Sequence, residues 1–178
     1  MKLICGLGNY GEHFENTRHN VGFFYLDKLC QSLDVEGRVQ DKYKSWIGKR
    51  VVENETVFFV KPVTYINSSG KVLKSLYHTF KYELEDLLLI HDDLDLSLGT
   101  YKLQRRRSSA GHRGVQSVID ALSSNDFWRL RVGIGRPSKD STPKEYVLEK
   151  FSAEERAVLE DLYAEELESA VEGWLTRF

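Results

Sequence analysis

The chain has 178 residues, an apolar fraction of 41% and a formal net charge of −2, which fits one domain, over residues 1–178, with one sizeable core. No run is long and apolar enough to span a membrane, and we expect no signal segment. Cys5 and Cys30 lie in apolar stretches and form no C-x-x-C pair. We therefore expect buried thiols in a reducing, cytoplasmic compartment rather than a disulfide or a metal site.

Strand and helix patterns alternate along the chain. Strands are expected at residues 3–7, 46–52, 56–61, 86–90, 101–104 and 129–135, with residues 53–55 turning between the second and third. Amphipathic helices are expected before residue 33, over 70–80, over 115–122 and from Ser152 to Trp174, and residues 34–45 should be a polar connection. This order predicts a single α/β domain with a mixed, mostly parallel sheet and helices on both faces.

Two of these strands differ in their expected burial. The run Asp86 to Ile90 is the most apolar in the chain and should be a central strand covered on both faces. In the strand at residues 129–135, apolar and polar residues alternate, which predicts a half-buried strand with Arg129 and Arg131 on one face and the apolar residues on the other.

The glycine-rich stretch Gly6-Leu7-Gly8-Asn9-Tyr10-Gly11 follows the first strand and resembles a dinucleotide fingerprint. A true fingerprint opens a helix at its glycines and is followed by an acidic residue about 20 positions later. The residues after Gly11 have no helical periodicity, and the next strand ends far too late. We therefore expect the glycines to let the backbone turn after the strand, leaving Asn9 and His19 for polar chemistry.

Basic charge is concentrated in the middle of the chain. Residues 101–150 contain eleven Lys/Arg and five Asp/Glu, whereas residues 151–178 contain two and eight. A basic face would suit a polyanion, although scattered charge often forms a solvated face that binds nothing. The run Arg105-Arg106-Arg107, which stands beside a Gly/His loop, favours the polyanion.

Polar side chains follow strands or precede helices at Asn9, His91-Asp92-Asp93, Asn67 and His112-Arg113. If they converge at the carboxyl edge of the sheet, the cleft holds His, Asp and Asn but no recognised nucleophile, which favours attack by water. A histidine is the natural general base, a carboxylate such as Asp92 would hold its tautomer, and asparagine amides could orient water or donate to an oxyanion.

Each of these residues also has a simpler interpretation. His19 could be an ordinary helix-start histidine, Asn67 an N-cap and His112 a loop residue. The acids after the central strand could be turn formers, or Asp92 and Asp95 could bind a metal with His91. No second cluster of ligand spacing accompanies them, so we give the metal less weight.

Five motifs resemble those of the bacterial peptidyl-tRNA hydrolase family. In chain order they are Gly6-Leu7-Gly8-Asn9-x-Gly11; Thr17-Arg18-His19-Asn20-x-Gly22; Thr64-Tyr65-Ile66-Asn67-x-Ser69-Gly70; His91-Asp92-Asp93-Leu94-Asp95; and Gly111-His112-x-Gly114 together with the later Arg129-Leu130-Arg131-Val132-Gly133-Ile134-Gly135-x-Pro137. The resemblance implies a monomeric, cytoplasmic α/β enzyme without a required cofactor, which cleaves the ester between peptide and tRNA and recycles tRNA.

The resemblance also implies roles for individual residues. His19 would be the general base, Asp92 would stabilise it, Asn9 would help to distinguish N-blocked from free aminoacyl-tRNA, and Asn67 would be a substrate-binding and catalytic amide. Phe14 and Tyr65 would contact the tRNA or peptide end, with His112 and Arg113 in the substrate-binding loop. Phosphates could meet the basic segment at Arg105, Arg106, Arg107 and Arg131.

The chain departs from the family pattern at several positions. Arg113 stands where the family usually has a substrate- and water-binding Asn, and an arginine cannot accept a hydrogen bond, so that role cannot transfer unchanged. Tyr10 replaces the usual Pro, Phe14 replaces a common Tyr, the approach to His112 is arginine-rich rather than glycine-rich, and the C-terminal part is short.

Three hypotheses remain. An esterase acting on peptidyl-tRNA is favoured by His19, Asp92, Asn9 and Asn67. A non-catalytic RNA-binding relative is favoured by Arg113. A metal-dependent hydrolase would use His91, Asp92 and Asp95, and insensitivity to a chelator would remove it.

Overall fold

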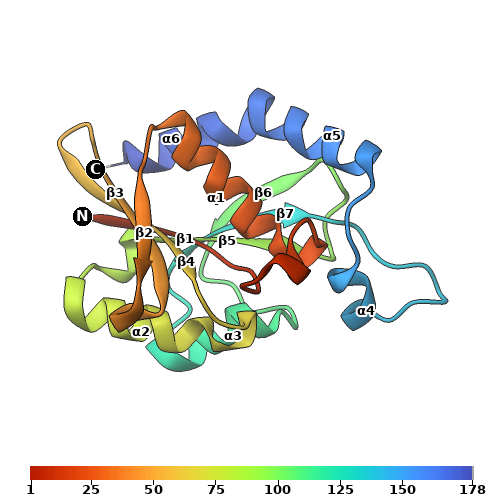
Figure 1. The fold of residues 1–178 in the computed structure, drawn as a ribbon, viewed down its shortest axis with the longest axis horizontal. Helices are drawn as coiled ribbons and strands as arrows, with labels where there is room; N and C mark the ends of the chain where they lie inside the picture. Colours follow the sequence, from red (N-terminus) through yellow and green to blue (C-terminus); the bar gives the residue numbers. More distant parts are fainter. Residues whose placement is uncertain (178) are drawn as a thin grey trace.

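A seven-stranded mixed sheet runs through the middle of the computed structural model, which describes residues 1–177 (Figure 1). Its strand order is β2-β3-β4-β1-β5-β7-β6. The strands are β1 (Lys2–Gly6), β2 (Gly37–Gln40), β3 (Ser45–Val52), β4 (Glu55–Pro62), β5 (Leu87–Asp93), β6 (Tyr101–Arg105) and β7 (Trp128–Gly133). The four central strands β4, β1, β5 and β7 are mutually parallel, and the pairs at both edges are antiparallel. The expected fold class is confirmed.

Helices cover both faces of this sheet, as Figure 1 shows. One layer contains α1 (Val21–Ser32), α5 (Ala153–Leu162) and α6 (Glu168–Leu175), and the other contains α2 (Ser69–Phe80) and α3 (Arg113–Leu122). The short helix α4 (Pro143–Leu148) stands apart at the end of the sheet. No helix within residues 1–177 combines the length and apolar character that a membrane crossing needs.

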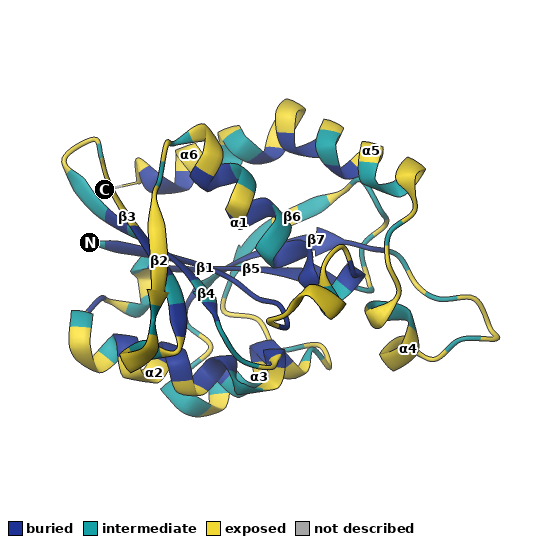
Figure 2. Ribbon diagram, viewed as in Figure 1, coloured by how far each residue is buried: buried dark blue, intermediate teal, exposed yellow. Residues whose placement is uncertain are grey.

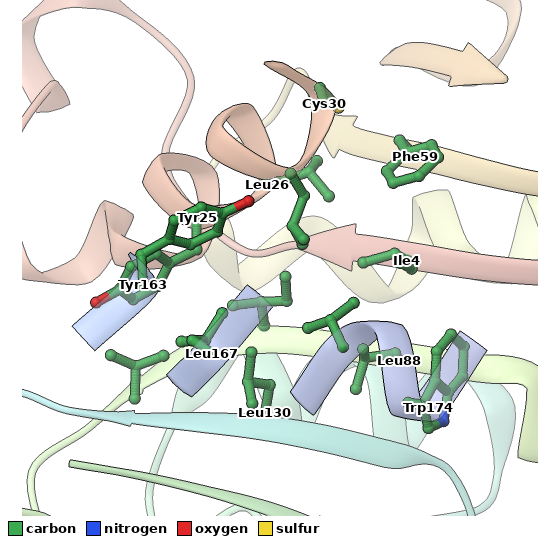
Figure 3. Packing of buried hydrophobic residues seen from close by; sticks show 14 of the residues in the cluster. Ile4, Tyr25, Leu26, Cys30, Phe59, Leu88, Leu130, Tyr163, Leu167 and Trp174 are labelled. Carbon is green, nitrogen blue, oxygen red and sulfur yellow. The ribbon is translucent and has the colours of Figure 1, made fainter. Parts of the chain in front are cut away.

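Each helical layer packs on its own hydrophobic cluster. Ile4, Leu88 and Leu130 point from the sheet toward α1, α5 and α6, where they meet Leu26 and Trp174 (Figure 3). The neighbouring strand residues point the other way, toward α2 and α3. Side chains alternate between the two faces of a strand, so the central strands are buried on both faces (Figure 2). Both cysteines are buried and free, as expected.

Close packing explains two of the glycines better than a turn does. A Cβ added to Gly6 would lie 2.4 Å from the carbonyl oxygen of Gly22, and one added to Gly22 would lie 2.3 Å from the carbonyl oxygen of Ile90. These glycines let α1 lie directly against β1 and β5. The helix begins at Val21, ten residues after Gly11, so the stretch is not a dinucleotide fingerprint.

Two local expectations are wrong. The polar stretch at residues 34–45 contains the short edge strand β2, paired with β3. Strand β7 is not half-buried but buried on both faces, because α-helices and the loop after β6 cover it. Its arginines have internal partners: Arg129 donates to the carbonyl of Ser108, and Arg131 pairs with Asp93. The expected C-terminal helix is confirmed from Ala153 to Leu175 and contains a π-helical turn, Tyr163–Leu167.

Candidate active site

Asp92, at the end of β5, is shared by two histidines. Its Oδ2 lies 2.9 Å from His19 Nδ1, and its Oδ1 lies 2.8 Å from His112 Nε2. The Asp92 side chain is 3% exposed, whereas His19 and His112 retain 13% and 8%. The buried strand therefore holds the carboxylate in place, and the two rings stand between it and solvent.

The hydrogen-bond partners determine the tautomers of both rings. His112 is the N-cap of α3, and its Nδ1 accepts the backbone N–H of Val115 at 3.1 Å, so the proton of the neutral ring is on Nε2 and is donated to Asp92. His19 donates to the same carboxylate through Nδ1. Its Nε2 is therefore left without a proton and can accept one from a water in the cleft.

The electrostatics of the three groups suit a general base. Burial alone would raise the pKa of Asp92, but His19 and His112 together outweigh it by charge and hydrogen bonding and hold that pKa well below its usual range. Burial lowers the pKa of His19, but the Asp92 carboxylate outweighs it, so the pKa lies above the ordinary value. Asp92 is thus ionised, and His19 is more basic than a free histidine.

The ring of His91 packs edge to face against that of His112, with centroids 4.9 Å apart, but it does not bind the Asp92 carboxylate. Its Nδ1 lies 2.8 Å from the backbone carbonyl of Asp92, and burial lowers the pKa of His91 well below its ordinary value. Within residues 1–177, the side chains gathered closely enough to hold a metal are His19, Asp92 and His112. The cluster of His91, Asp92 and Asp95 that the metal hypothesis needs does not form, because His91 is buried behind the strand and Asp95 pairs with Arg136.

Asn9 is fixed beside this group from two sides. The Asn20 side chain accepts from the Asn9 backbone N–H at 2.8 Å and donates to its carbonyl at 2.9 Å. The Asn9 side-chain oxygen accepts the backbone N–H of Ile66 at 2.7 Å. The Asn9 amide NH₂ group has no partner among the described residues and is available as a donor. Asn20 belongs to the motif that contains His19, but its positioning role depends on contacts with Asn9 that sequence spacing does not reveal.

Asn9, His19, Asp92 and His112 line one cleft of about 750 Å³ with the other residues expected there. Asn67 is exposed on the short helix Ile66–Ser68, and the rings of Phe14 and Tyr65 meet edge to face with centroids 6.2 Å apart. Tyr65 is 68% exposed. The remaining lining includes Arg113, Arg136, Pro143, Lys144, Val147 and Leu148, so α4 forms one wall. The structure thus brings together the residues expected in the cleft, except His91, which is buried and does not line it.

Arg18, which sequence reasoning gave no role, attaches α4 to the residues beside His19. Its guanidinium contacts Glu149 at 3.3 Å and Glu155 at 3.1 Å, and it lies 4.2 Å from the centroid of the Tyr146 ring. The backbone N–H of Arg18 also donates to the Glu149 carbonyl. A buried arginine next to His19 therefore connects α4, which forms a wall of the cleft, to the segment that carries His19.

The expected phosphate-binding arginines lie in different surroundings. Arg105 and Arg106 both pair with Asp126 at the surface, and Arg107 is exposed without an ion-pair partner among the described residues. Arg131 is 6% exposed, and its Nε donates to Asp93 at 2.7 Å. This corrects the expectation for Arg131: buried on β7 and neutralised by a carboxylate, it is not presented to a phosphate, and we leave it out of the proposed surface.

The fold and the cleft define an α/β enzyme of the kind in which a carboxylate-held histidine can act on water without a nucleophilic side chain. The family model for peptidyl-tRNA hydrolase matches residues 3–177. The chain belongs to the peptidyl-tRNA hydrolase family.

Individual relatives agree with this assignment. The chain is 40% identical to the peptidyl-tRNA hydrolase of Shouchella clausii over 99% of this chain and 95% of that one. It is 42% identical to that of Aquifex aeolicus over 89% and 82%. Among solved structures, the peptidyl-tRNA hydrolase of Acinetobacter baumannii superposes with a TM-score of 0.90 at 29% identity, covering 97% of this chain and 87% of that one.

Proposed function

We propose that this protein hydrolyses the ester bond between the peptide and the terminal ribose of peptidyl-tRNA, as a monomer in the cytoplasm, and so recycles tRNA from abortive translation. The observation that carries the proposal is the His19–Asp92 hydrogen bond at the wall of an amide-lined cleft. Membership of the family supports the choice of substrate.

His19 acts as the general base. Its Nε2 takes a proton from a water molecule as the water oxygen attacks the ester carbonyl carbon, and the imidazolium that forms is stabilised by Asp92. The tetrahedral intermediate then collapses, the bond to the ribose oxygen breaks, and His19 returns the proton to that oxygen. The products are the peptide carboxylic acid, which ionises, and tRNA with a free hydroxyl group.

The amides bind the groups that change charge. The unpartnered NH₂ group of Asn9 and the exposed amide of Asn67 can donate to the oxyanion or to the peptide carbonyls. An N-blocked substrate offers Asn9 an amide, whereas a free aminoacyl group would present an ammonium, which repels a donor. Asn9 thereby favours peptidyl-tRNA over aminoacyl-tRNA.

The tRNA end meets the aromatic and cationic rim. Phe14 and Tyr65 offer ring faces on which a terminal base can stack. Arg113 and Lys144 line the same cleft and have no ion-pair partner among the described residues, so they can meet phosphate or carbonyl oxygens. Arg113 and the exposed Arg107 extend this positive rim along the loop before α3.

Release of tRNA from an N-acetylated aminoacyl-tRNA, with a chelator present, tests the proposal. Wild type should turn over, and His19→Ala should reduce kcat by about 10²- to 10⁴-fold while tRNA affinity is retained. His78→Ala, at an exposed histidine on α2, is the matched control and should keep full activity. Equal loss of turnover and tRNA affinity in His19→Ala would reject the base assignment.

Arg113→Asn in the same assay separates the enzyme from a non-catalytic RNA-binding relative. Arg113 is exposed at the first turn of α3 and does not contact Asp92 or His19, so we expect wild type to be active already and the variant to change kcat/KM by less than about tenfold. An inactive wild type that gains turnover with Arg113→Asn would instead indicate a fold retained for binding.

A further inference from the structure

A second cleft, of about 650 Å³, shares Asn9 with the His19 cleft. Its walls come from α1, β3, β4 and the loop after β1, and include Phe23, Phe24, Trp46, Lys61, Tyr10, Glu12 and Glu15. The residues between the clefts alternate in sequence. In the turn Glu12–Phe14, Glu12 lines the second cleft and Phe14 lines the His19 cleft. Likewise, Val63 lines the second cleft and Tyr65 the His19 cleft. The two clefts therefore adjoin at the catalytic centre.

The two clefts carry opposite charge. The second has three carboxylates, Glu12, Glu15 and Asp27, against the single ammonium of Lys61. Lys61 pairs with Asp27, and Glu12 and Glu15 have no ion-pair partner among residues 1–177. In the His19 cleft the corresponding unpaired charges are the cations Arg113 and Lys144. A polyanion is repelled from the second cleft and attracted to the first.

The second cleft already accommodates an ammonium group belonging to the chain itself. Lys61 Nζ lies 5.0 Å from the centroid of the Trp46 ring and 6.0 Å from that of Phe23, while it pairs with Asp27. Ring faces and a carboxylate together recognise cations. Glu12, Glu15 and the 55%-exposed ring of Tyr10 provide the same chemistry nearer to solvent, where a second cation can enter.

We propose that the second cleft binds the peptide part of peptidyl-tRNA, beyond the residue esterified to tRNA, and favours a lysine or arginine side chain there. This inference rests on the proposed function. The substrate has an anionic half and a peptide half, and only the peptide fits a cleft rimmed by carboxylates. The substrate then crosses Asn9, with tRNA on the side of Arg113 and the growing peptide on the side of Trp46.

The test uses tRNA esterified with N-acetylated tetrapeptides of alanine in which one residue is replaced. Lysine or glutamate is placed second, third or fourth from the ester, since each extended residue moves the side chain by about 3.3 Å. At low salt, wild type should hydrolyse the lysine substrate with a kcat/KM about two- to tenfold above that of the glutamate substrate at one or more positions.

Paired variants assign this preference to the cleft. In Glu12→Gln/Glu15→Gln the lysine-to-glutamate ratio should fall to about one. Glu165→Gln/Glu166→Gln, which removes two exposed carboxylates from the π-helical turn beside α5, changes the net charge equally and should keep the wild-type ratio. A wild-type ratio of about one at all three positions, or an unchanged ratio in Glu12→Gln/Glu15→Gln, would overturn the inference.

N-acetylalanyl-tRNA separates this inference from the proposed function. That substrate has no residue beyond the first and does not need the second cleft. If wild type hydrolyses it but shows no lysine preference with tetrapeptides, only the peptide subsite fails. If wild type releases no tRNA from any of these substrates, the proposed function and the inference that rests on it both fail.

Discussion

Arg18 and Arg106 both form ion pairs, but they lie in opposite environments. The Arg18 side chain is 9% exposed, contacts Glu149 and Glu155, and packs on aromatic rings next to His19. Arg106 is 69% exposed and forms two hydrogen bonds to Asp126 alone. In sequence, Arg106 is the conspicuous residue because it stands in a run of three arginines.

The difference shows that burial, rather than local charge density, decides what an arginine contributes. A surface pair is weakened by water and salt and contributes about 0–1 kcal/mol. A guanidinium that is itself buried against carboxylates and ring faces exchanges its partners for water less readily, so it helps to fix the geometry of its neighbours. Arg18 is therefore held by internal contacts beside His19, whereas Arg107, which is exposed and has no ion-pair partner among the described residues, can meet a polyanion.

Asp92→Asn should have the largest effect on the buried region. The uncharged Asn amide cannot replace the carboxylate that accepts hydrogen bonds from both histidines. We therefore expect kcat/KM to fall by about 10²- to 10⁴-fold. The base form of His19 predominates above its pKa, so wild-type activity should rise with pH through a value above the ordinary 6.5. Without Asp92 the burial effect is unopposed, the pKa of His19 falls, and the acid limb of the pH–rate profile should move to lower pH.

Asp126→Asn is the matched control on the exposed region, because this carboxylate, like Asp92, is shared by two basic side chains, here Arg105 and Arg106. Its pH–rate profile should coincide with that of wild type. An acid limb that stays in place in Asp92→Asn would show that His19 does not carry the titration seen in the rate.

Arg18→Met should have the next largest effect, on stability. It removes the ion pairs to Glu149 and Glu155 and the contact with Tyr146, and we expect the free energy of unfolding to fall by about 1–3 kcal/mol. Urea denaturation measures the change. Arg106→Met should cost less than about 1 kcal/mol in the same experiment, and equal losses in the two variants would contradict the distinction drawn from burial.

Arg107→Gln should have the smallest effect, and only on tRNA binding. If the exposed Arg107 contacts a phosphate, the slope of log K against log salt should decrease in magnitude by about one. Arg106→Gln should change the slope less, because Asp126 already neutralises Arg106. Filter binding over a series of salt concentrations measures both slopes. A slope unchanged by Arg107→Gln would exclude that side chain from the tRNA interface.

The sequence by itself determined the fold class, most of the strands and helices, and most of the polar residues that line the cleft. Apolar periodicity marks β1, β5 and the helix faces because burial of apolar side chains drives those elements together. The motifs around Asn9, His19, Asn67 and Asp92 are local, and each occurs where a strand or loop ends. Parallel strands bring such ends to one edge of the sheet, so their convergence could be anticipated.

Only the tertiary structure decided which polar groups are partners. The alternation in β7 predicted exposed arginines, but both have partners inside the fold. The carbonyl of Ser108 accepts a hydrogen bond from Arg129, and Asp93 from the neighbouring strand neutralises Arg131. His112 proved to be a second partner of Asp92, and Arg18 contacts Glu149 at the end of α4 and Glu155 in α5, which lie 131 and 137 positions away. Hydrogen bonds and ion pairs depend on distances between distant segments, which local periodicity does not encode.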